Sequence, residues 1–209
     1  MDYLEIEGKK QLNRFGIPIN DSILLTENVD LTKVPYPCVL KGQILSGKRG
    51  KAGAVRVVKS EEELKEVKEI IEKITINGKS MEGIIACGFL PIVEEYYMGM
   101  TLDVKNRAVI MLFTPFGGMD IEELATTSPE KLMRLDCTEG FDEAAFRESA
   151  KIFELPDERL NKIVDIAKKL STACFALDST TIEVNPLAVL EDGSVVAIDA
   201  KLVIDDNSL

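Results

Sequence analysis

A glycine-rich, basic loop between two β-branched runs constrains the fold of this chain more than any other segment. The runs lie near Val39 and Val55, and the loop between them carries several glycines. Glycine reaches positive φ angles and lets the backbone approach a ligand, so consecutive N–H groups can converge on phosphate oxygens. The loop and its flank add the cations Lys41, Lys48, Arg49 and Lys51 to a chain whose formal net charge is -11. The pattern predicts a strand, a phosphate-binding turn and a second strand; a solvated hairpin loop is the alternative.

This loop is not of the Walker type. No Gly-Lys-Ser/Thr follows the glycines, and the chain continues into a strand where a Walker loop would open a helix. A hairpin loop that covers phosphates is a different device, and it needs a second element to hold a metal ion.

A second hairpin near the end of the sequence is the candidate for that element. The runs 181–187 and 194–201 look like strands, and the Asp-Gly turn between them is a strong hairpin signal. Alternation along a strand places Glu183 and Asn185 on one face. Asp199 lies on the partner strand among apolar residues, where a charge is costly unless it has a partner. Such oxygen ligands suit Mg²⁺, so we predict a magnesium site; a polar outer face on an edge hairpin is the alternative.

These motifs, with others in order along the chain, resemble the ATP-grasp domain of the β subunit of succinyl-CoA synthetase and related NDP-forming acyl-CoA synthetases. The resemblance covers essentially the whole chain, through the segments 4–18, 50–53, 95–99, 117–122, 129–131, 183–187 and 198–201. It implies an α/β (α+β) ATP-grasp fold with two lobes and a nucleotide cleft between them. Residues 1–20 and 91–209 would form the larger lobe with the metal site, and residues 21–90 the smaller lobe with the phosphate loop.

The resemblance also implies a role for each matching residue. Lys41 would contact ATP (or GTP) phosphates, and the loop over them would consist of Gly47, Lys48, Arg49 and Gly50. The nucleotide would also lie against Glu95 and the hinge residues Cys87 and Leu90. Asn185 and Asp199 would bind Mg²⁺, and Glu183 would be catalytic, near a phosphorylated histidine of a partner subunit. These roles agree with what phosphoryl transfer requires, because a lysine and magnesium neutralise charge that develops on the γ-phosphate.

The chain departs from the family pattern at two of these positions. Lys48 stands where the family usually has the second glycine of Gly-Gly-Arg-Gly, and Cys87 stands in place of the usual hinge glutamate. These departures favour an alternative function, that of a non-catalytic ATP-grasp-like binding or scaffold subunit.

The sequence contains no histidine. Members of the resembled family relay a phosphoryl group through a histidine, because imidazole is a competent nucleophile near neutral pH. The resemblance therefore implies an acid–thiol ligase of the succinate–CoA ligase type, as in the tricarboxylic acid cycle. It would be incomplete without a CoA-binding α-type subunit that carries the phosphohistidine, so a hetero-oligomer is expected. The sequence stops where the β subunit would continue, so we expect no C-terminal CoA-ligase domain in it.

Composition excludes several other classes of protein. The 25 Lys and Arg residues against 36 Asp and Glu residues argue against nucleic acid as the main partner. No apolar run is long enough to span a bilayer, so no membrane partner is expected. The four cysteines form no CxxC pair and are interpreted as core residues in a reducing compartment, the cytoplasm.

Periodicity predicts the other elements. A capping box at 60–63 begins a helix whose apolar stripe consists of Leu64, Val67, Ile70, Ile71 and Ile74. Further helices are expected over 141–153, over 160–177 and after Ser128, and strands over 83–87, 92–97, 100–104 and 108–113. Tyr96 and Tyr97 are interpreted as packing residues.

Overall fold

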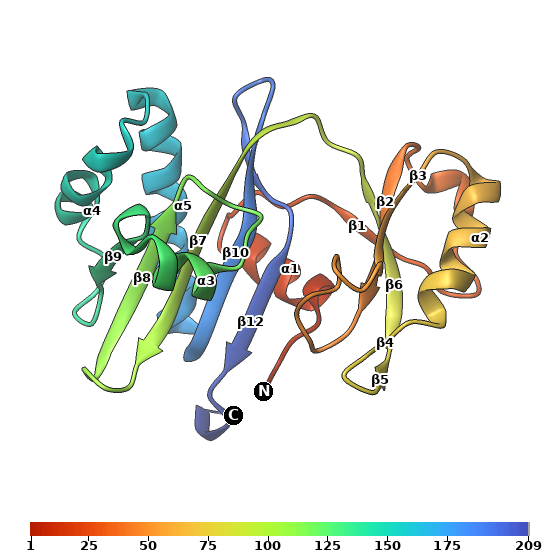
Figure 1. Ribbon diagram of the computed structural model, residues 1–209, viewed down its shortest axis with the longest axis horizontal. Helices are drawn as coiled ribbons and strands as arrows, with labels where there is room; N and C mark the ends of the chain where they lie inside the picture. The colour runs from red at the N-terminus through yellow and green to blue at the C-terminus, as the bar shows by residue number, and fades with distance from the viewer. Residues whose placement is uncertain (209) are drawn as a thin grey trace. The chain divides into compact units, whose positions relative to one another are not determined.

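The computed structural model describes residues 1–208 and separates into two compact units (Figure 1). The smaller unit comprises Leu4–Ile6 and Asn20–Leu90; the larger unit comprises Met1–Tyr3, Glu7–Ile19 and the chain from Pro91 onward. That these units form the two lobes of a nucleotide cleft stays a prediction.

The smaller unit is an antiparallel four-stranded sheet with one helix packed on it. The strand order is β1-β6-β2-β3, and β4 and β5 form a separate two-stranded sheet. The elements are β1 (Ser22–Leu24), η1 (Leu31–Lys33), β2 (Cys38–Gln43), β3 (Val55–Val58), α2 (Glu61–Glu72), β4 (Thr75–Ile76), β5 (Lys79–Ser80) and β6 (Gly83–Gly88). The predicted strand–loop–strand arrangement is confirmed, because β2 pairs with β3 in antiparallel register.

Helix α2 begins at the predicted capping box. The Ser60 hydroxyl accepts a hydrogen bond from the backbone N–H of Glu63 at 3.3 Å, and the Glu63 carboxylate accepts one from the backbone N–H of Lys59 at 2.7 Å. Leu64 and Ile71 are fully buried. The predicted stripe is wrong at Ile70, which is 44% exposed, because successive helical residues point about 100° apart and only a narrow seam of α2 meets the sheet.

The two faces of the smaller sheet have different characters. Cys38 and Leu40 point toward α2 and belong to its core. Gly42 shares that face, since a Cβ there would lie 3.2 Å from Ile71. Strand alternation therefore places Lys41 and Gln43 on the opposite face, away from α2.

The larger unit is built on an antiparallel sheet of six strands. The order is β11-β10-β7-β8-β9, and β12 also pairs with β10. The elements are α1 (Glu5–Arg14), whose first two residues belong to the smaller unit, β7 (Ile92–Asp103), β8 (Ala108–Thr114), α3 (Ile121–Thr127), η2 (Pro129–Lys131), β9 (Met133–Asp136), α4 (Glu143–Ala150), η3 (Lys151–Phe153), α5 (Asp157–Ala176), β10 (Ser179–Leu190), β11 (Val195–Ala197), β12 (Ala200–Ile204) and η4 (Asp206–Ser208).

Several predicted elements of this unit differ in extent. The strand expected over 194–201 is divided into β11 and β12, so Asp199 lies between two strands and not on one. The strands expected over 92–97 and 100–104 are one strand, β7, because Gly99 stays in the ladder and pairs with Glu183 and Leu112. The helix expected after Ser128 is the single 3-10 turn η2, and the Ser128 side chain makes no capping bond. The helix expected over 141–153 is the α-helix α4 followed by the 3-10 turn η3.

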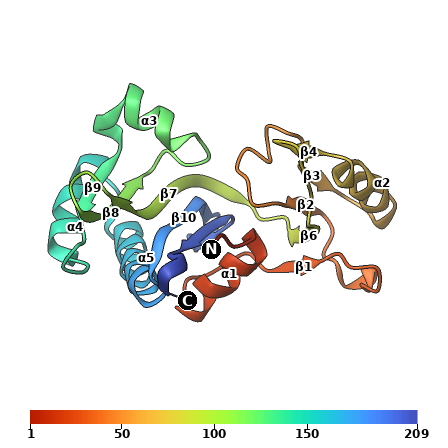
Figure 2. The same ribbon diagram turned by 90° about the horizontal axis from the view of Figure 1, so that it is seen from below.

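The larger sheet is covered on both faces. Figure 2 shows α3 on one side of β7 and β8, and α4 and α5 on the other. The α4/α5 side carries the main core, including Met98, Met100 and Val184. The α3 side carries a smaller cluster that includes Tyr97 and Leu124. None of the helices that the structure describes combines the length and the apolarity that a bilayer crossing demands.

Candidate functional site

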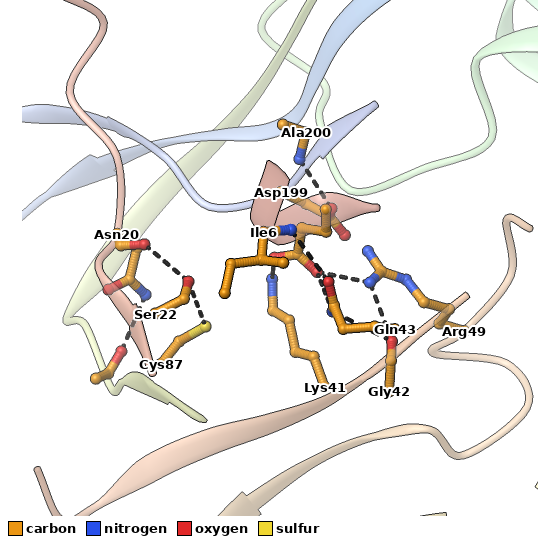
Figure 3. A network of polar contacts seen from close by, with 12 residues as sticks. Ile6, Asn20, Ser22, Lys41, Gly42, Gln43, Arg49, Cys87, Asp199 and Ala200 are labelled. Atoms are coloured by element: carbon orange, nitrogen blue, oxygen red, sulfur yellow. Dashed lines mark hydrogen bonds and ion pairs between the residues drawn. The ribbon is translucent and has the colours of Figure 1, made fainter. Parts of the chain in front are cut away.

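Two of the predicted phosphate-binding cations of the smaller unit, Lys41 and Arg49, meet at one carboxylate. Lys41 Nζ lies 2.9 Å from Glu5 Oε1, and Arg49 Nη1 lies 2.6 Å from Glu5 Oε2. Arg49 Nη1 also donates to the Gly42 carbonyl at 3.2 Å, and Gln43 Nε2 donates to Glu5 Oε2 at 3.5 Å. The side chains of Lys41, Gln43 and Arg49 converge in Figure 3, where dashed lines mark these contacts. The side chains of Glu5, Lys41 and Arg49 are only 1%, 6% and 11% exposed.

The glycine-rich loop is folded by its own backbone. The Ala52 N–H donates to the Lys48 carbonyl at 3.1 Å, and the Ala54 N–H donates to the Arg49 carbonyl at 3.0 Å. A Cβ on Gly47 or Gly50 would meet nothing within 4 Å. These two glycines therefore leave open space beside the loop.

Lys48 has a left-handed backbone conformation, which would suit the glycine that the resembled family usually has at this position. Its φ is 67°, in a region that costs an L-residue with a Cβ roughly 1–2 kcal/mol. Lys48 therefore keeps a backbone conformation that glycine would adopt without strain, although its own side chain disfavours that conformation.

Replacing Lys48 with glycine is expected to stabilise the smaller unit by about 0.5–1 kcal/mol. The relief of the left-handed strain exceeds the entropy that glycine adds to the unfolded chain. Urea unfolding measures the change. The matched variant Lys51→Gly makes the same charge change at an exposed loop residue whose φ is not positive, and it should destabilise the protein. Equal effects of both changes would contradict the strain at Lys48.

The hinge residues lie at the end of the smaller unit. Cys87 is fully buried, and its sulfur lies 3.3 Å from the Ser22 hydroxyl. Leu90 is half-buried. Their predicted contact with a nucleotide stays a prediction, and the burial of Cys87 means that its thiol offers no surface to a ligand in this structure.

In the larger unit, Glu183 lies in the middle of the sheet beside a tyrosine. Its register partners are Gly99 on β7 and Lys201 on β12. The Tyr97 hydroxyl donates to Glu183 Oε2 at 3.1 Å. A Cβ on Gly99 would lie 2.6 Å from the Tyr97 hydroxyl and 3.0 Å from Glu183 Cβ. Because position 99 has no side chain, the Tyr97 side chain can pass over it and reach Glu183 on the neighbouring strand β10.

The environment of Glu183 favours its protonated form. Burial raises the pKa of Glu183, and the charges of Glu122 and Asp199 raise it further, while Lys201 and the Tyr97 hydrogen bond act in the opposite direction. Burial and the Glu183 charge also raise the pKa of Tyr97. Tyr97 therefore remains a hydrogen-bond donor at neutral pH.

Glu183→Gln is expected to make the protein more stable than the wild type at neutral pH. The folded state holds the Glu183 proton more tightly than the unfolded state. The stability that the protonated side chain gives the wild type is therefore complete below the ordinary pKa of 4.5 and is lost as pH rises through the raised pKa of the folded state. Glutamine has no proton to lose and avoids this loss. The gain should therefore vanish in acid. Urea unfolding across this pH range measures it, with exposed Glu130→Gln as control. A gain that does not change with pH would contradict the raised pKa.

Asn185 and Glu95 are brought together by the loop that contains Gly117 and Gly118. The Gly118 N–H donates to Asn185 Oδ1 at 2.9 Å, and Asn185 Nδ2 donates to the Met119 carbonyl at 3.2 Å. The Gly117 N–H donates to the Glu95 carbonyl at 2.7 Å. A Cβ on Gly118, whose φ is 72°, would overlap the Glu95 carboxylate. A Cβ on Gly117 would overlap the backbone of Tyr96, so the loop depends on glycine at both positions.

Asn185 and Asp199 offer the oxygen atoms that Mg²⁺ prefers. Asp199 Oδ1 accepts a hydrogen bond from the Ala200 N–H at 2.8 Å. Within residues 1–208 no three or more His, Cys, Asp or Glu side chains gather where they could hold a metal ion. One carboxylate and one amide oxygen match the hard oxygen ligands of Mg²⁺, which typically binds one or two carboxylates and completes its octahedron with phosphates and water. That Asn185 and Asp199 bind it together stays a prediction.

Sequence reasoning missed two residues of these sites. Glu5 contacts Lys41 across 36 positions of the chain, and no local pattern marks it. Tyr97 is buried, as a packing residue should be, but its hydroxyl also contacts Glu183. The glycine two positions after it, Gly99, is the signal that could have indicated this contact.

The family of this chain follows from its match to known sequences. The ATP-grasp domain family matches residues 3–189. The chain belongs to the ATP-grasp domain family. The predicted α/β ATP-grasp fold is thereby confirmed, and solved structures of similar fold agree with it.

Curated relatives of this ATP-grasp domain are β subunits of succinate–CoA ligases. The ADP-forming enzyme's β subunit from Methanocaldococcus jannaschii is 35% identical over 209 residues, which cover 98% of this chain and 57% of that protein. The GDP-forming enzyme's β subunit from Thermus thermophilus is 32% identical, over 100% of this chain and 57% of that protein. The predicted resemblance is therefore confirmed. The chain spans less than three fifths of the length of either relative.

A solved structure shows the same fold at lower identity. It is an acetyl-coenzyme A synthetase of Ca. Korarchaeum cryptofilum, in complex with coenzyme A and Mg-AMPPCP and with a phosphohistidine segment that points towards the nucleotide-binding site. The TM-score is 0.70 at 19% identity, over 98% of this chain and 93% of that chain. This similarity concerns the fold of the ATP-grasp domain.

Proposed function

We propose that this chain is the nucleotide-binding part of an NDP-forming acyl-CoA synthetase of the succinate–CoA ligase type. It binds MgATP or MgGTP and exchanges the γ-phosphoryl group with a histidine on a CoA-binding α-type partner subunit. The observation that carries the proposal is the match of 98% or more of the chain to succinate–CoA ligase β subunits.

The chemistry of the described residues supports this proposal. Lys41 and Arg49 already bind a carboxylate, and the same cations suit phosphate oxygens. Asn185 and Asp199 would hold Mg²⁺, whose charge neutralises the phosphates when it is bound. Glu95, beside Gly118, would border the nucleotide; the loop glycines Gly47 and Gly50 would let the backbone approach the phosphates.

The absence of histidine from the sequence supports the need for a partner. Because the chain cannot itself form a phosphohistidine, the acceptor must come from another polypeptide or another segment. We assign Glu183, which accepts a hydrogen bond from Tyr97, as the residue that lies next to that histidine during phosphoryl transfer. The cytoplasmic location stays a prediction.

A non-catalytic binding subunit is the second candidate function. It is favoured by the buried thiol of Cys87 and by the left-handed conformation of Lys48, both at positions where the family pattern has other residues. Nucleotide binding without phosphoryl transfer to any α-type subunit would support this candidate.

Calorimetric titration with ATP, with and without Mg²⁺, and with GTP for comparison, tests the proposed function. We expect binding that depends on magnesium. No binding of either nucleotide at millimolar concentration, alone or together with a CoA-binding α-type subunit, would overturn the proposal.

Asp199→Asn is expected to weaken MgATP binding by about 10-fold, or about 1.4 kcal/mol, and to leave binding of metal-free ATP nearly unchanged. The reason is that an amide lacks the charge with which a carboxylate attracts Mg²⁺. The same titrations measure both affinities. Asp178→Asn, at an exposed position of the larger unit, is the matched control. Equal weakening with and without Mg²⁺ would show that Asp199 does not act through the metal.

A further inference from the structure

The contact between Glu5, Lys41 and Arg49 has the geometry of an oxyanion site. Each carboxylate oxygen of Glu5 receives a different cation, Lys41 at 2.9 Å on Oε1 and Arg49 at 2.6 Å on Oε2. Phosphate presents oxygen atoms to lysine and arginine through the same charge-assisted hydrogen bonds. The two cations therefore contact a carboxylate of their own chain where they could contact a phosphate.

Glu5 is held in this position from several sides. It is the first residue of α1, and a carboxylate is stabilised near the N-terminus of a helix. The next residue, Ile6, donates its N–H to Gln43 Oε1 at 3.0 Å, while Gln43 Nε2 donates to Glu5 Oε2 at 3.5 Å. All of these residues belong to the smaller unit. The carboxylate is thus an ordered, nearly fully buried ligand of the cation pair.

We propose that Glu5 is a built-in competitor for phosphate at the Lys41–Arg49 pair. A polyphosphate group that approaches these cations must displace the carboxylate from at least one of them. Glu5 therefore lowers the affinity of the site for phosphate and keeps the two cations paired when no phosphate is bound. That the natural ligand is a nucleoside triphosphate rests on the proposed function; the competition itself concerns the phosphate groups alone.

The sign of a substitution separates this role from a structural one. If Glu5 only orients the two cations, its loss lets them move and weakens phosphate binding. If Glu5 competes, its loss leaves two positive charges without this carboxylate, and phosphate binds more tightly.

The first test is calorimetric titration of the full chain with inorganic tripolyphosphate, without metal. Glu5→Gln is expected to bind the probe at least about 10-fold more tightly than the wild type, because the amide keeps the size of the side chain and removes its charge. Glu27→Gln, at an exposed position of the same unit, makes the same charge change and should bind like the wild type. Equal or weaker binding by Glu5→Gln would overturn the proposal.

A second measurement covers the case in which Glu5→Gln folds poorly. Tripolyphosphate should raise the Tm of Glu5→Gln by about 3 °C more than that of the wild type, because ligand that binds the folded state more tightly stabilises it more. If the variant is unfolded in buffer, the probe should restore its folded circular dichroism spectrum. Failure to restore the spectrum, or an equal rise in Tm, counts against the proposal.

Parallel titrations with MgATP separate this inference from the proposed function. Tighter tripolyphosphate binding by Glu5→Gln, without MgATP binding by either protein, would support the competitor and count against the proposed function. If the wild type and Glu5→Gln bind tripolyphosphate equally and both bind MgATP strongly, the result supports the proposed function and counts against the competitor.

Discussion

Lys41→Met is expected to lower the affinity of the chain for MgATP by at least about 100-fold, or about 2.7 kcal/mol. It removes one of the two cations that meet at Glu5, and a cation bonded to phosphate contributes through a charge-assisted hydrogen bond. We also expect a loss of stability. Removing one partner of a buried ion pair usually costs about 3–5 kcal/mol of stability, because the other charge is left alone. Here Arg49 remains beside the Glu5 carboxylate, so the free energy of unfolding should fall by no more than about 3 kcal/mol. Calorimetry and urea unfolding measure the two effects.

Lys59→Met is the matched control for this variant. Lys59 belongs to the same unit and is exposed, so its removal makes the same charge change without disturbing the Glu5 contact. It should alter MgATP affinity and stability little. An unchanged affinity of Lys41→Met for MgATP would remove Lys41 from the nucleotide site, and an unchanged stability would show that its ion pair with Glu5 contributes nothing to folding.

Gly117→Ala is expected to have the largest effect on the larger unit. A Cβ at this position would lie 2.6 Å from the backbone nitrogen of Tyr96 and closer still to its carbonyl, and neither atom can move without shifting β7. Overpacking of this kind costs about 1–3 kcal/mol or more. Because the adjacent Gly118 N–H donates to Asn185, the shift should also displace Asn185 and reduce magnesium-dependent binding. Urea unfolding and titration with MgATP measure these losses.

Gly8→Ala is the control for that change. Gly8 lies in α1 within the larger unit, and a Cβ there would lie 3.6 Å from Leu202 Cβ, an ordinary contact. In a helix this substitution should stabilise by up to about 1 kcal/mol. A wild-type stability for Gly117→Ala would mean that the loop before α3 can move away from β7 at no cost.

Local patterns predicted the elements whose signals lie within a few residues. The Asp-Gly turn between β-branched runs is the connection between β10 and β11, and the capping box at Ser60 begins α2. The longest predicted helix, over 160–177, is α5 at Asp157–Ala176. These elements were predictable because turn chemistry, caps and helical periodicity act over short stretches of chain.

The sites depend on contacts that no short pattern contains. Tyr97 reaches Glu183 across 86 residues of sequence, and the Glu5–Lys41 contact likewise joins distant segments. A glycine such as Gly99 can break a strand or stay in it, and only the cross-strand neighbours decide which. Which site residues contact the nucleotide or the metal stays a prediction, because these contacts are made to groups that are not part of the chain.

The pairing of β7 with β10 has a consequence for how the larger unit folds. β10 lies between β7 on one side and β11 and β12 on the other, and its contacts with β7 join segments more than 80 residues apart, as Tyr97 and Glu183 show. During synthesis β7 can pair early with β8, its neighbour along the chain, but its other edge must wait for β10. Long-range closure of this kind is slow, and an unpaired edge strand can pair with other chains. The yield of folded protein should therefore depend on how quickly β10 reaches that open edge.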